Sequence, residues 1–586
     1  MGHLLNRRAF LALTTGTAVS AASGRLWGSG LIPMPVAKGA AEERLDAFTA
    51  AYMQAMNAPG MTQALTDTTA TIRTAGYGFG NVELKAPVTP DQLFQIGSIT
   101  KSFAALIMLQ LREEGKVDLH RPVLEYLPWL PVTMPYGPIT AHHLLTHTSG
   151  LPDADCIFQN DPSARHAQGY PPGAHFHYCN LGFAILGQII QKLDARPWYQ
   201  CLQARILTPL GMTATAAVIT IESSARSATG YQAFFDDQVY PRKGRLAPRP
   251  PEVFANPAGS IASPAGDMAR YLRMLLNRGW ETNLRIVSEE SFALLSTPYI
   301  KAPEFSPTAS YGYGIAVDTL DGHKILRHTG GMNCFASSIH VDLDGGVAAF
   351  ASINAMQGYR PTPITQYAVQ LLRAEHEAKP LPAPGALKDA AEVENAGNYA
   401  GVFRNGDGKE LLFKAEGTKL LLMHGGEEIV LQRSEGDLFL STVQGGFSDY
   451  TWAFGRDLAN SKTGTGGDGD HAKGPAAEAP VVEVAYGPDW YTNAAYRGPR
   501  EFPTPPGYSA FIGRYRSDSG DDVRVFMRKG ALWLGDSPLT EIGSALFRVG
   551  NDSWSPDTAE FLTIVEGSAR LLRVIGEDCW RLEVGA

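Results

Sequence analysis

The chain is poor in cysteine. Its 586 residues include only five cysteines, with no Cys-x-x-Cys pair and no histidine partner at the spacing of a metal site. A small scaffold held together by disulfides and a structural zinc site are therefore both excluded. In an oxidising compartment one disulfide can form, and the odd number leaves at least one thiol unpaired. The cysteines are Cys156, Cys179, Cys201, Cys334 and Cys579.

The chain also lacks dense clusters of lysine and arginine, and it lacks long apolar runs. It carries 50 basic and 59 acidic residues, and the formal net charge of −9 argues against a nucleic-acid-binding surface. Beyond the N-terminal segment no apolar run is long enough to cross a bilayer. With 44% hydrophobic and 19% charged residues, the composition is that of a folded soluble protein. We expect about two to four domains, no nucleic-acid partner and no stable membrane span after signal removal.

The N-terminus has a different composition. Arg7 and Arg8 precede a weakly apolar stretch that ends near Ala22. This order of basic, apolar and small residues is typical of an export signal, and the adjacent arginines resemble a bacterial twin-arginine signal. An ordinary secretion signal is the alternative. We assign residues 1–41 to the signal and leader, with the cleavage position left open, and expect the mature protein in the periplasm or outside the cell.

The stretch from 42 to 378 shows both helical and β-strand periodicity. A helix and short strands come first, a long helical stretch follows, and three strands and a last helix end the region. This order predicts an α+β domain with an antiparallel sheet flanked by helices and an all-helical lobe. We predict a loop around Gly76, Gly78 and Gly80. The expected segments are a helix over 42–57, strands over 61–65, 69–74, 324–331, 335–343 and 347–354, and a helix over 363–377.

The C-terminal part has short alternating strands, Gly and Asp turns and almost no helical periodicity. A weak internal repeat relates residues 398–404 to 511–516, and each copy precedes a pair of strands. We therefore predict two small all-β, barrel-like domains. The expected divisions are a Pro-rich linker over 379–386, a lipocalin-like barrel over 387–487 with a disordered loop at about 459–480, a linker over 488–507 and a second barrel over 508–586. The expected strand pairs are 410–415 with 419–423 and 522–527 with 531–534.

A serine and a lysine open the predicted helix that begins near Gly97. Ser98 and Lys101 are three positions apart, so their side chains share one helical face. A serine hydroxyl is a weak nucleophile at neutral pH and needs a base to take its proton as it attacks. Lysine can serve as that base where burial or a nearby cation lowers its pKa. Alone the pair proves little, because many surface helices contain one.

Two further patterns supply what a lysine-activated serine requires. Such a site also needs a proton donor for the leaving group and fixed N–H donors for the developing oxyanion. Tyr178 and Asn180 precede a predicted helix and offer a phenol for proton transfer and an amide to orient the lysine or the substrate. The predicted strand through His328 ends in Gly330 and Gly331, where a substrate backbone can lie close because no Cβ intervenes.

Three histidines between 139 and 151 invite comparison with a metal site. Only His143 and His147 have the i, i+4 spacing, and no glutamate lies between them as in His-Glu-x-x-His. We therefore favour packed or hydrogen-bonded histidines, His142 included, over metal ligands. We expect no cofactor and no metal.

Together these motifs resemble the β-lactamase-related serine hydrolases, which include class C β-lactamases, D-alanyl-D-alanine carboxypeptidases, D-aminopeptidases and family VIII esterases. The resemblance covers residues 42–378 and rests on several motifs in the family's order and separations. A catalytic domain of this kind followed by two β-barrels resembles the domain plan of bacterial D-aminopeptidases. The matching segments are Phe94–Lys101, Leu144–Pro152, Tyr178–Asn180 and His328–Gly331.

The resemblance implies a role for each motif residue. Ser98 is the expected nucleophile, and Lys101 is the base that activates it. Tyr178 is the expected partner acid/base, with Asn180 holding Lys101 or the substrate. The expected substrate-binding and oxyanion residues are His328, Gly330 and Gly331, with the N–H groups of Ser98 and Gly331 forming the oxyanion hole.

His328 stands where many relatives carry lysine. A lysine there is a permanent cation for a substrate carboxylate, whereas histidine, with an ordinary pKa of about 6.5, is mostly neutral at pH 7. The residue weakens the case for a β-lactamase or carboxypeptidase and resembles variants found in D-aminopeptidases and some esterases. The alternative is a strand residue that only hydrogen-bonds its neighbours.

We therefore expect an exported serine hydrolase that forms an acyl-enzyme and hydrolyses a small amide or ester, such as a D-amino-acid-containing peptide. Its expected partner is a small-molecule or short-peptide substrate, and the oligomeric state is left open. One alternative is a β-lactamase or D-alanyl-D-alanine carboxypeptidase. The other is a non-catalytic penicillin-binding sensor, although such a module need not keep a general base.

Overall fold

The structure is a computed structural model that describes residues 39–159, 165–235, 238–250, 253–332, 334–355, 360–387, 389–443, 446–457, 479–518 and 520–582. The chain groups into two units, each described here by itself. The first takes the chain up to Gln232 and Leu246–Leu387, and the second takes Ala233–Arg245 and the chain from Lys388. Almost all of the predicted export signal and most of the loop predicted at 459–480 lie outside the described residues.

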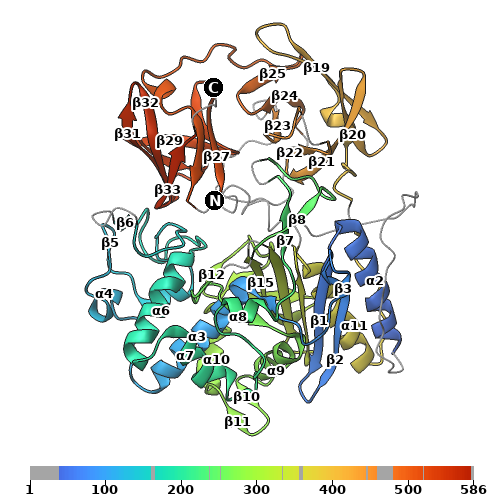
Figure 1. The fold of residues 1–586 in the computed structure, drawn as a ribbon, viewed down its shortest axis with the longest axis vertical. Helices are drawn as coiled ribbons and strands as arrows, with labels where there is room; N and C mark the ends of the chain where they lie inside the picture. The colour runs from blue at the N-terminus through green and yellow to red at the C-terminus, as the bar shows by residue number, and fades with distance from the viewer. Residues whose placement is uncertain are drawn as a thin grey trace. The chain divides into compact units, whose positions relative to one another are not determined.

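The first unit is built on a nine-stranded antiparallel sheet (Figure 1). β17 pairs with β1, with Met61 opposite Ile353, so the first hairpin of the unit joins its last strands in one sheet. The predicted α+β architecture is confirmed. The strands, in sheet order, are β12 Ile300–Lys301, β13 Ser310–Tyr311, β14 Ala316–Leu320, β15 His323–Met332, β16 Phe335–Asp342, β17 Val347–Ile353, β1 Gly60–Asp67, β2 Thr71–Asn81 and β3 Ala86–Pro87.

The predicted loop around Gly76, Gly78 and Gly80 is wrong, because all three glycines lie within β2. They allow close backbone contacts inside the sheet. A Cβ at Gly76 would lie 2.3 Å from the carbonyl oxygen of Val88. Glycine within a strand here marks a close approach of two backbones, not a turn.

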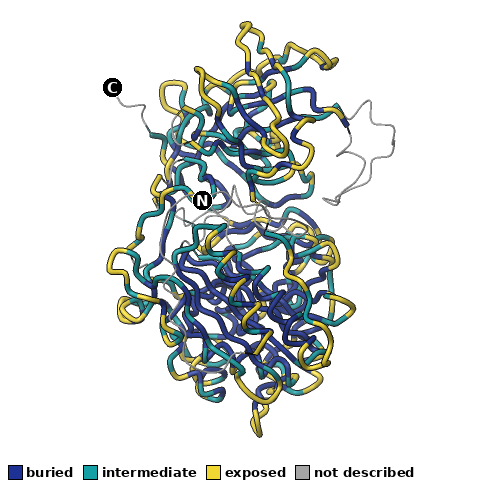
Figure 2. The backbone as a smooth tube through the Cα atoms, turned by 90° about the vertical axis from the view of Figure 1, so that its right-hand side faces the viewer, coloured by how far each residue is buried: buried dark blue, intermediate teal, exposed yellow. Residues whose placement is uncertain are grey.

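Helices pack on both faces of the sheet. α2 (Ala40–Met56) and α11 (Thr362–His376) share one buried apolar cluster with β1 and β17, which includes Phe48, Tyr367 and Ile353. α9 (Ala265–Leu276) contacts the same two strands but contributes nothing to that cluster, so it covers the opposite face. Figure 2 shows the interior of this unit as mostly buried and its outer loops as exposed.

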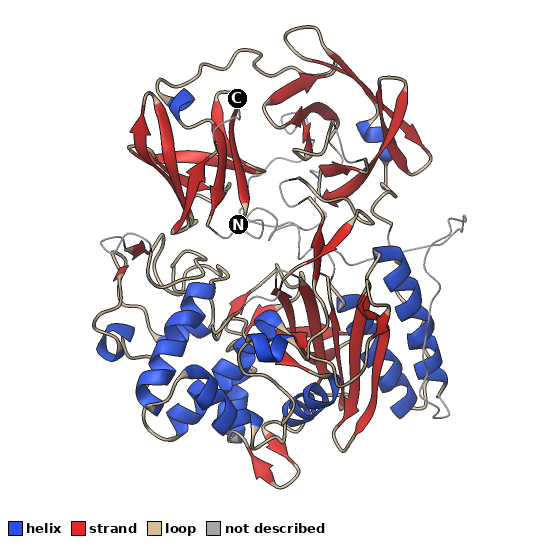
Figure 3. Ribbon diagram, in the orientation of Figure 1, coloured by secondary structure: helices blue, strands red, loops and turns tan. Residues whose placement is uncertain are grey.

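A helical lobe lies beside the sheet in the first unit (Figure 3). Its central pair, α3 and α6, pack against each other, and α5, α7 and α10 contact one or the other. The helices are α3 Thr100–Glu113, α4 Val123–Tyr126, α5 Ala141–Leu145, α6 Asn180–Asp194, α7 Trp198–Leu202, α8 Ile221–Ser224 and α10 Glu289–Leu295. Four short strand pairs accompany them: β4 Phe94–Gln95 with β9 Ala262–Ser263, β5 Val132–Thr133 with β6 His166–Ala167, β7 Tyr231–Ala233 with β8 Leu246–Pro248, and β10 Trp280–Glu281 with β11 Leu284–Arg285.

The second unit contains two closed eight-stranded antiparallel barrels, as the repeat predicts. In both, a single 3-10 turn precedes the first strand: Ala396–Tyr399 and Tyr508–Ala510. The first barrel consists of β18 Gly401–Arg404, β19 Glu410–Glu416, β20 Lys419–His424, β21 Glu427–Glu435, β22 Leu438–Ser441, β23 Trp452–Arg456, β24 Val481–Tyr486 and β25 Asp489–Thr492. The second consists of β26 Gly513–Ser517, β27 Asp522–Arg528, β28 Ala531–Leu534, β29 Ser537–Gly543, β30 Leu546–Val549, β31 Thr558–Val565, β32 Ser568–Val574 and β33 Glu577–Arg581.

The segment predicted as a linker over 488–507 needs a correction at its start. β25 (Asp489–Thr492) pairs with β24 and, through Thr492 opposite Arg404, closes the first barrel. Tyr491, an aromatic residue of β25, belongs to the barrel, since its side chain is buried in the barrel core. Strand alternation over four residues is too short a signal to separate from a linker.

The fold bears on the expected absence of membrane-spanning helices and on the pairing of the cysteines. None of the helices in the described parts of the chain is both long and apolar enough to cross a membrane. No disulfide joins any two of the five cysteines, and four of them are buried.

The fold predicts a high cost for a side chain at Gly330. A Cβ there would lie 1.8 Å from the carbonyl oxygen of Ile96 and 2.2 Å from Ser337 Oγ. Gly330→Ala should therefore lower the free energy of unfolding of the first unit by about 2 kcal/mol or more. Gly266→Ala, at a helical position with nothing within 4 Å of the new Cβ, is the control and should be neutral or slightly stabilising. Thermal unfolding compares them, and equal melting temperatures would contradict the packing described here.

Candidate active site

Ser98 lies on a tight turn that leads into α3. The 3-10 turn Gly97–Ile99 precedes the helix, which begins at Thr100, so the serine sits just before the helix and not on it. Gly97 has a φ of 52°, a left-handed conformation that glycine adopts without strain. The N–H of Ile96 donates to the carbonyl of Ile261 at 3.0 Å and fixes the approach to the turn. Ser98 is half-buried, between a buried residue on either side.

The side chain of Lys101 is fully buried and points at Ser98. Its Nζ donates hydrogen bonds to Ser98 Oγ at 3.0 Å, Asn180 Oδ1 at 2.7 Å and the carbonyl of Ala258 at 2.9 Å. A buried ammonium ion is costly unless it is hydrogen-bonded, and these acceptors meet that requirement. At 3.0 Å a proton can pass between Oγ and Nζ. The sequence could not identify the carbonyl of Ala258 as an acceptor, because every residue has a backbone oxygen.

Asn180 is the first residue of α6 and is held on three sides. Its backbone N–H donates to Asp153 Oδ1 at 2.8 Å, and its Nδ2 donates to Asp155 Oδ1 at 3.2 Å. Since the amide nitrogen faces Asp155, the amide oxygen faces Lys101. Asp153 and Asp155 therefore set the orientation of the amide, a role that sequence reasoning missed, although both follow the Leu144–Pro152 motif directly.

Tyr178 packs against the buried lysine. Lys101 Nζ lies 4.8 Å from the centroid of the Tyr178 ring, within the range of a cation–π contact. The centroid of the Tyr178 ring also lies 4.3 Å from the centroid of the His147 ring. The structure thus brings Ser98, Lys101, Tyr178 and Asn180 together around one ammonium group.

The end of β15 lies directly against the turn that carries Ser98. A Cβ on Gly97 would lie 2.7 Å from the backbone nitrogen of Gly331 and 3.0 Å from the carbonyl carbon of Gly330. Ser337 Oγ on β16 donates to the carbonyl of Ile96 at 2.7 Å and ties the two segments together. The backbones of Gly331 and Ser98 are therefore neighbours, the arrangement that two oxyanion donors require.

His328 is buried and engaged by both ring nitrogens. Nδ1 lies 2.6 Å from the carbonyl oxygen of Thr329, which can only accept, so Nδ1 carries the proton. Nε2 then accepts the hydroxyl proton of Tyr311 at 2.8 Å. Burial, followed by the charge of Lys101, lowers the pKa of His328 to about 3. At neutral pH His328 therefore offers no positive charge to a substrate. Its hydrogen bonds to Thr329 and Tyr311 are those expected of a strand residue that only hydrogen-bonds its neighbours.

The three histidines of the 139–151 stretch are packed and hydrogen-bonded, as predicted. His142 Nδ1 bonds the hydroxyl of Tyr313 at 2.9 Å, and His143 Nδ1 accepts the N–H of Thr140 at 3.2 Å. His147 Nδ1 accepts the N–H of Cys179 at 3.0 Å. Across the described residues, no group of three or more His, Cys, Asp and Glu side chains is placed to hold a metal ion.

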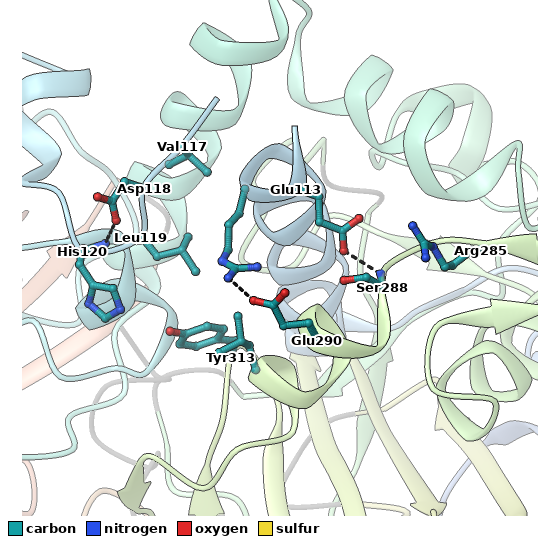
Figure 4. Close-up of a pocket in the computed structure, with 11 residues that line it drawn as sticks. Glu113, Val117, Asp118, Leu119, His120, Arg285, Ser288, Glu290 and Tyr313 are labelled. Atoms are coloured by element: carbon teal, nitrogen blue, oxygen red, sulfur yellow. Dashed lines mark hydrogen bonds and ion pairs between the residues drawn. The ribbon is translucent and has the colours of Figure 1, made fainter. Parts of the chain in front are cut away.

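A cavity of about 650 Å³ lies at the far end of α3 from Ser98 (Figure 4). Its charged groups are largely paired with one another. Arg112 bonds Glu290 at 2.5 Å, and Glu113 accepts the N–H of Ser288 at 2.7 Å. None of the predicted site residues lines this cavity. We therefore place the chemistry at Ser98 and not here.

The comparison with known protein families agrees with this geometry. Residues 45–374 match the family model described as Beta-lactamase, which is more than half of the chain. The chain belongs to the beta-lactamase family. Proteins of this family are generally serine hydrolases.

Individual relatives place the chain near penicillin-binding proteins. It is 29% identical over 279 residues to penicillin-binding protein 4 of Amycolatopsis lactamdurans, covering 45% of this chain and 72% of that one. It is also 29% identical over 256 residues to Protein Rv1367c of Mycobacterium tuberculosis, covering 38% of this chain. The match spans only 63% of the mycobacterial protein's length.

One solved structure resembles more than the family region. The octameric penicillin-binding protein homologue from Pyrococcus abyssi matches with a TM-score of 0.53 and 26% sequence identity. The match covers 70% of this chain and 96% of that one. The structural match therefore covers a larger share of this chain than the family match does.

The neutral His328 predicts an acid-sensitive catalytic unit. Its folded-state pKa lies below the unfolded value of 6.5, so its stabilising contribution is complete above pH 6.5 and is lost as the pH falls toward 3. Each pKa unit corresponds to about 1.4 kcal/mol. His328→Gln should therefore lose less melting temperature between pH 7 and pH 4 than the natural protein.

The exposed His376 provides the control for that experiment. His376→Gln lies in the same unit, at the end of α11, and should keep the acid sensitivity of the natural protein. Differential scanning calorimetry across the pH range measures all three proteins. Identical pH slopes for His328→Gln and the natural protein would show that His328 is not held neutral.

Proposed function

We propose that the protein is an exported serine hydrolase that forms an acyl-enzyme on Ser98 and hydrolyses a small amide or ester, such as a D-amino-acid-containing peptide. The observation that carries the proposal is the buried Nζ of Lys101, 3.0 Å from Ser98 Oγ. The paired arginines near the N-terminus support export to the periplasm.

In the proposed reaction, the ammonium group of Lys101 first loses one proton to solvent, and the resulting neutral amine takes the proton of Ser98 as Oγ bonds to the substrate carbonyl carbon. The N–H groups of Ser98 and Gly331 stabilise the resulting oxyanion. Tyr178 gives its phenolic proton to the leaving nitrogen or oxygen as that bond breaks, and Lys101 returns a proton to the phenolate. Water then cleaves the ester on Ser98, releasing a carboxylic acid and restoring the hydroxyl.

The proposed substrate class follows from the environment of His328. Position 328 supplies no positive charge for a substrate carboxylate, because both ring nitrogens are engaged and the ring is neutral. A substrate that depends on such a pairing would lose a charge-assisted hydrogen bond of about 1.5–3 kcal/mol. Neutral amides and esters carry no such requirement.

Removal of the Ser98 hydroxyl should abolish turnover. Ser98→Ala should lower kcat for a p-nitrophenyl ester and for D-alanine p-nitroanilide by at least about 1,000-fold, because no acyl-enzyme can form. Ser102→Ala is the matched control, since that hydroxyl bonds Ile99 and Tyr271 one turn away. It should keep activity within about threefold while losing about 1 kcal/mol of stability. Unchanged turnover in Ser98→Ala would mean that the nucleophile is wrongly assigned.

A substrate panel tests the proposed class. The kcat/KM for D-alanine p-nitroanilide and a short-chain ester should exceed that for nitrocefin and for a cell-wall pentapeptide by at least about tenfold, since 1.4 kcal/mol is a factor of ten. The L-alanine anilide is the stereochemical control. Efficient nitrocefin hydrolysis or release of terminal D-alanine would instead favour a β-lactamase or carboxypeptidase. A stable adduct without turnover would favour a penicillin-binding sensor.

A further inference from the structure

His147 contacts Tyr178 and both of its neighbours in the chain. Its carbonyl oxygen accepts the N–H of His177 at 2.8 Å, and its Nδ1 accepts the N–H of Cys179 at 3.0 Å. Its ring lies against the ring of Tyr178, with centroids 4.3 Å apart and planes at 32°. One residue thus fixes the backbone before Tyr178, the backbone after it and one face of the phenol.

The backbone of His147 adopts an uncommon conformation that makes these contacts possible. Its φ is 57°, in the left-handed region, which is uncommon for non-glycine residues and is enriched in asparagine, aspartate and histidine. The residue follows Thr146, the C-cap of α5, and its carbonyl and ring both contact the 177–179 segment. A strained conformation persists only where the surroundings enforce it, and it is often found at functional sites.

The side chain of His147 is packed among aromatic rings. The side chain has no exposed surface and lies among the rings of Phe176, Phe183 and Tyr311. Since Nδ1 accepts a backbone N–H, the proton of the neutral ring is on Nε2. The aromatic packing holds the imidazole in one orientation against the Tyr178 ring, which in turn lies 4.8 Å from Lys101 Nζ.

We propose that His147 is a positioning residue for Tyr178, holding the phenol where it can protonate the leaving group. This inference rests on the proposed function, in which Tyr178 is the proton donor. A displacement of about 1 Å in a reacting group can cost a factor of about 100 in rate. The loss of His147 should therefore act on the step that Tyr178 catalyses and leave substrate binding nearly unchanged.

Leaving-group dependence separates this role from a general structural one. An amide nitrogen must gain a proton as the C–N bond breaks, so a displaced Tyr178 slows that step strongly. A p-nitrophenolate leaves without a proton, so an ester of p-nitrophenol needs Tyr178 much less. A merely structural defect would slow both substrates by the same factor.

Two substitutions test the proposal without forcing the backbone. His147→Gly removes the side chain and tolerates the left-handed φ, and His147→Asn tolerates the same φ while returning an acceptor for the Cys179 N–H. We expect His147→Gly to lower kcat for D-alaninamide by about 10- to 100-fold, and kcat for p-nitrophenyl acetate by less than about threefold. KM should stay within about twofold, and His147→Asn should recover part of the amide activity.

Tyr178→Phe, measured in parallel, separates this inference from the proposed function. If Tyr178→Phe shows the leaving-group dependence but His147→Gly slows both substrates equally, or neither, the positioning role is wrong. If Tyr178→Phe shows no leaving-group dependence, the proposed role of Tyr178 fails and this inference fails with it. Melting temperatures of all variants identify a loss of folded protein, in which case His147→Asn, which keeps the acceptor, decides the outcome.

Discussion

A single buried amine organises the catalytic unit of this protein. Lys101 has no exposed surface, and its Nζ is surrounded by Ser98, Asn180, the carbonyl of Ala258 and the face of Tyr178. These groups come from the turn before α3, the start of α6 with the segment that precedes it, and the loop before β9, so these parts of the unit must close around the amine for the site to exist. Of the three acceptors Ser98, Asn180 and Ala258, Ser98 is the half-exposed one, which directs the chemistry of the amine to Ser98.

Burial and the same charge both disfavour protonation of the surrounding histidines. Burial comes first, and the positive charge of Lys101 then adds to it, in lowering the pKa of both His147 and His328. Neutral imidazoles can accept hydrogen bonds, and each does so here: His147 from Cys179, and His328 from Tyr311. His328 therefore helps to support the strand next to Ser98. Because it is neutral, it supplies no positive charge for a substrate carboxylate, and the proposed substrate class rests on that.

The sequence was informative where side-chain chemistry and periodicity carry the signal. The Ser98–Lys101 spacing, the Tyr178–Asn180 pair and the glycines after His328 are local patterns, and the structure brings all of them together. The strands and helix from β15 to α11 and the two barrels were predicted from apolar alternation and a repeat. Contacts made by backbone groups, and contacts that orient a site residue, could not be predicted from the sequence. The carbonyl of Ala258, the carboxylates that hold Asn180 and the left-handed His147 take up their places only through tertiary folding. The glycines of β2 misled for the same reason, because a close approach and a turn look alike in sequence.

The central claim is that chemistry passes through a covalent bond to Ser98. Mass spectrometry of the protein quenched during turnover of a slowly hydrolysed ester tests it most directly. The account predicts a mass increase equal to the acyl group, located on the peptide that contains Ser98 and absent from Ser98→Ala. An adduct on another residue, or steady turnover with no adduct under conditions that trap acyl-enzymes, would contradict it.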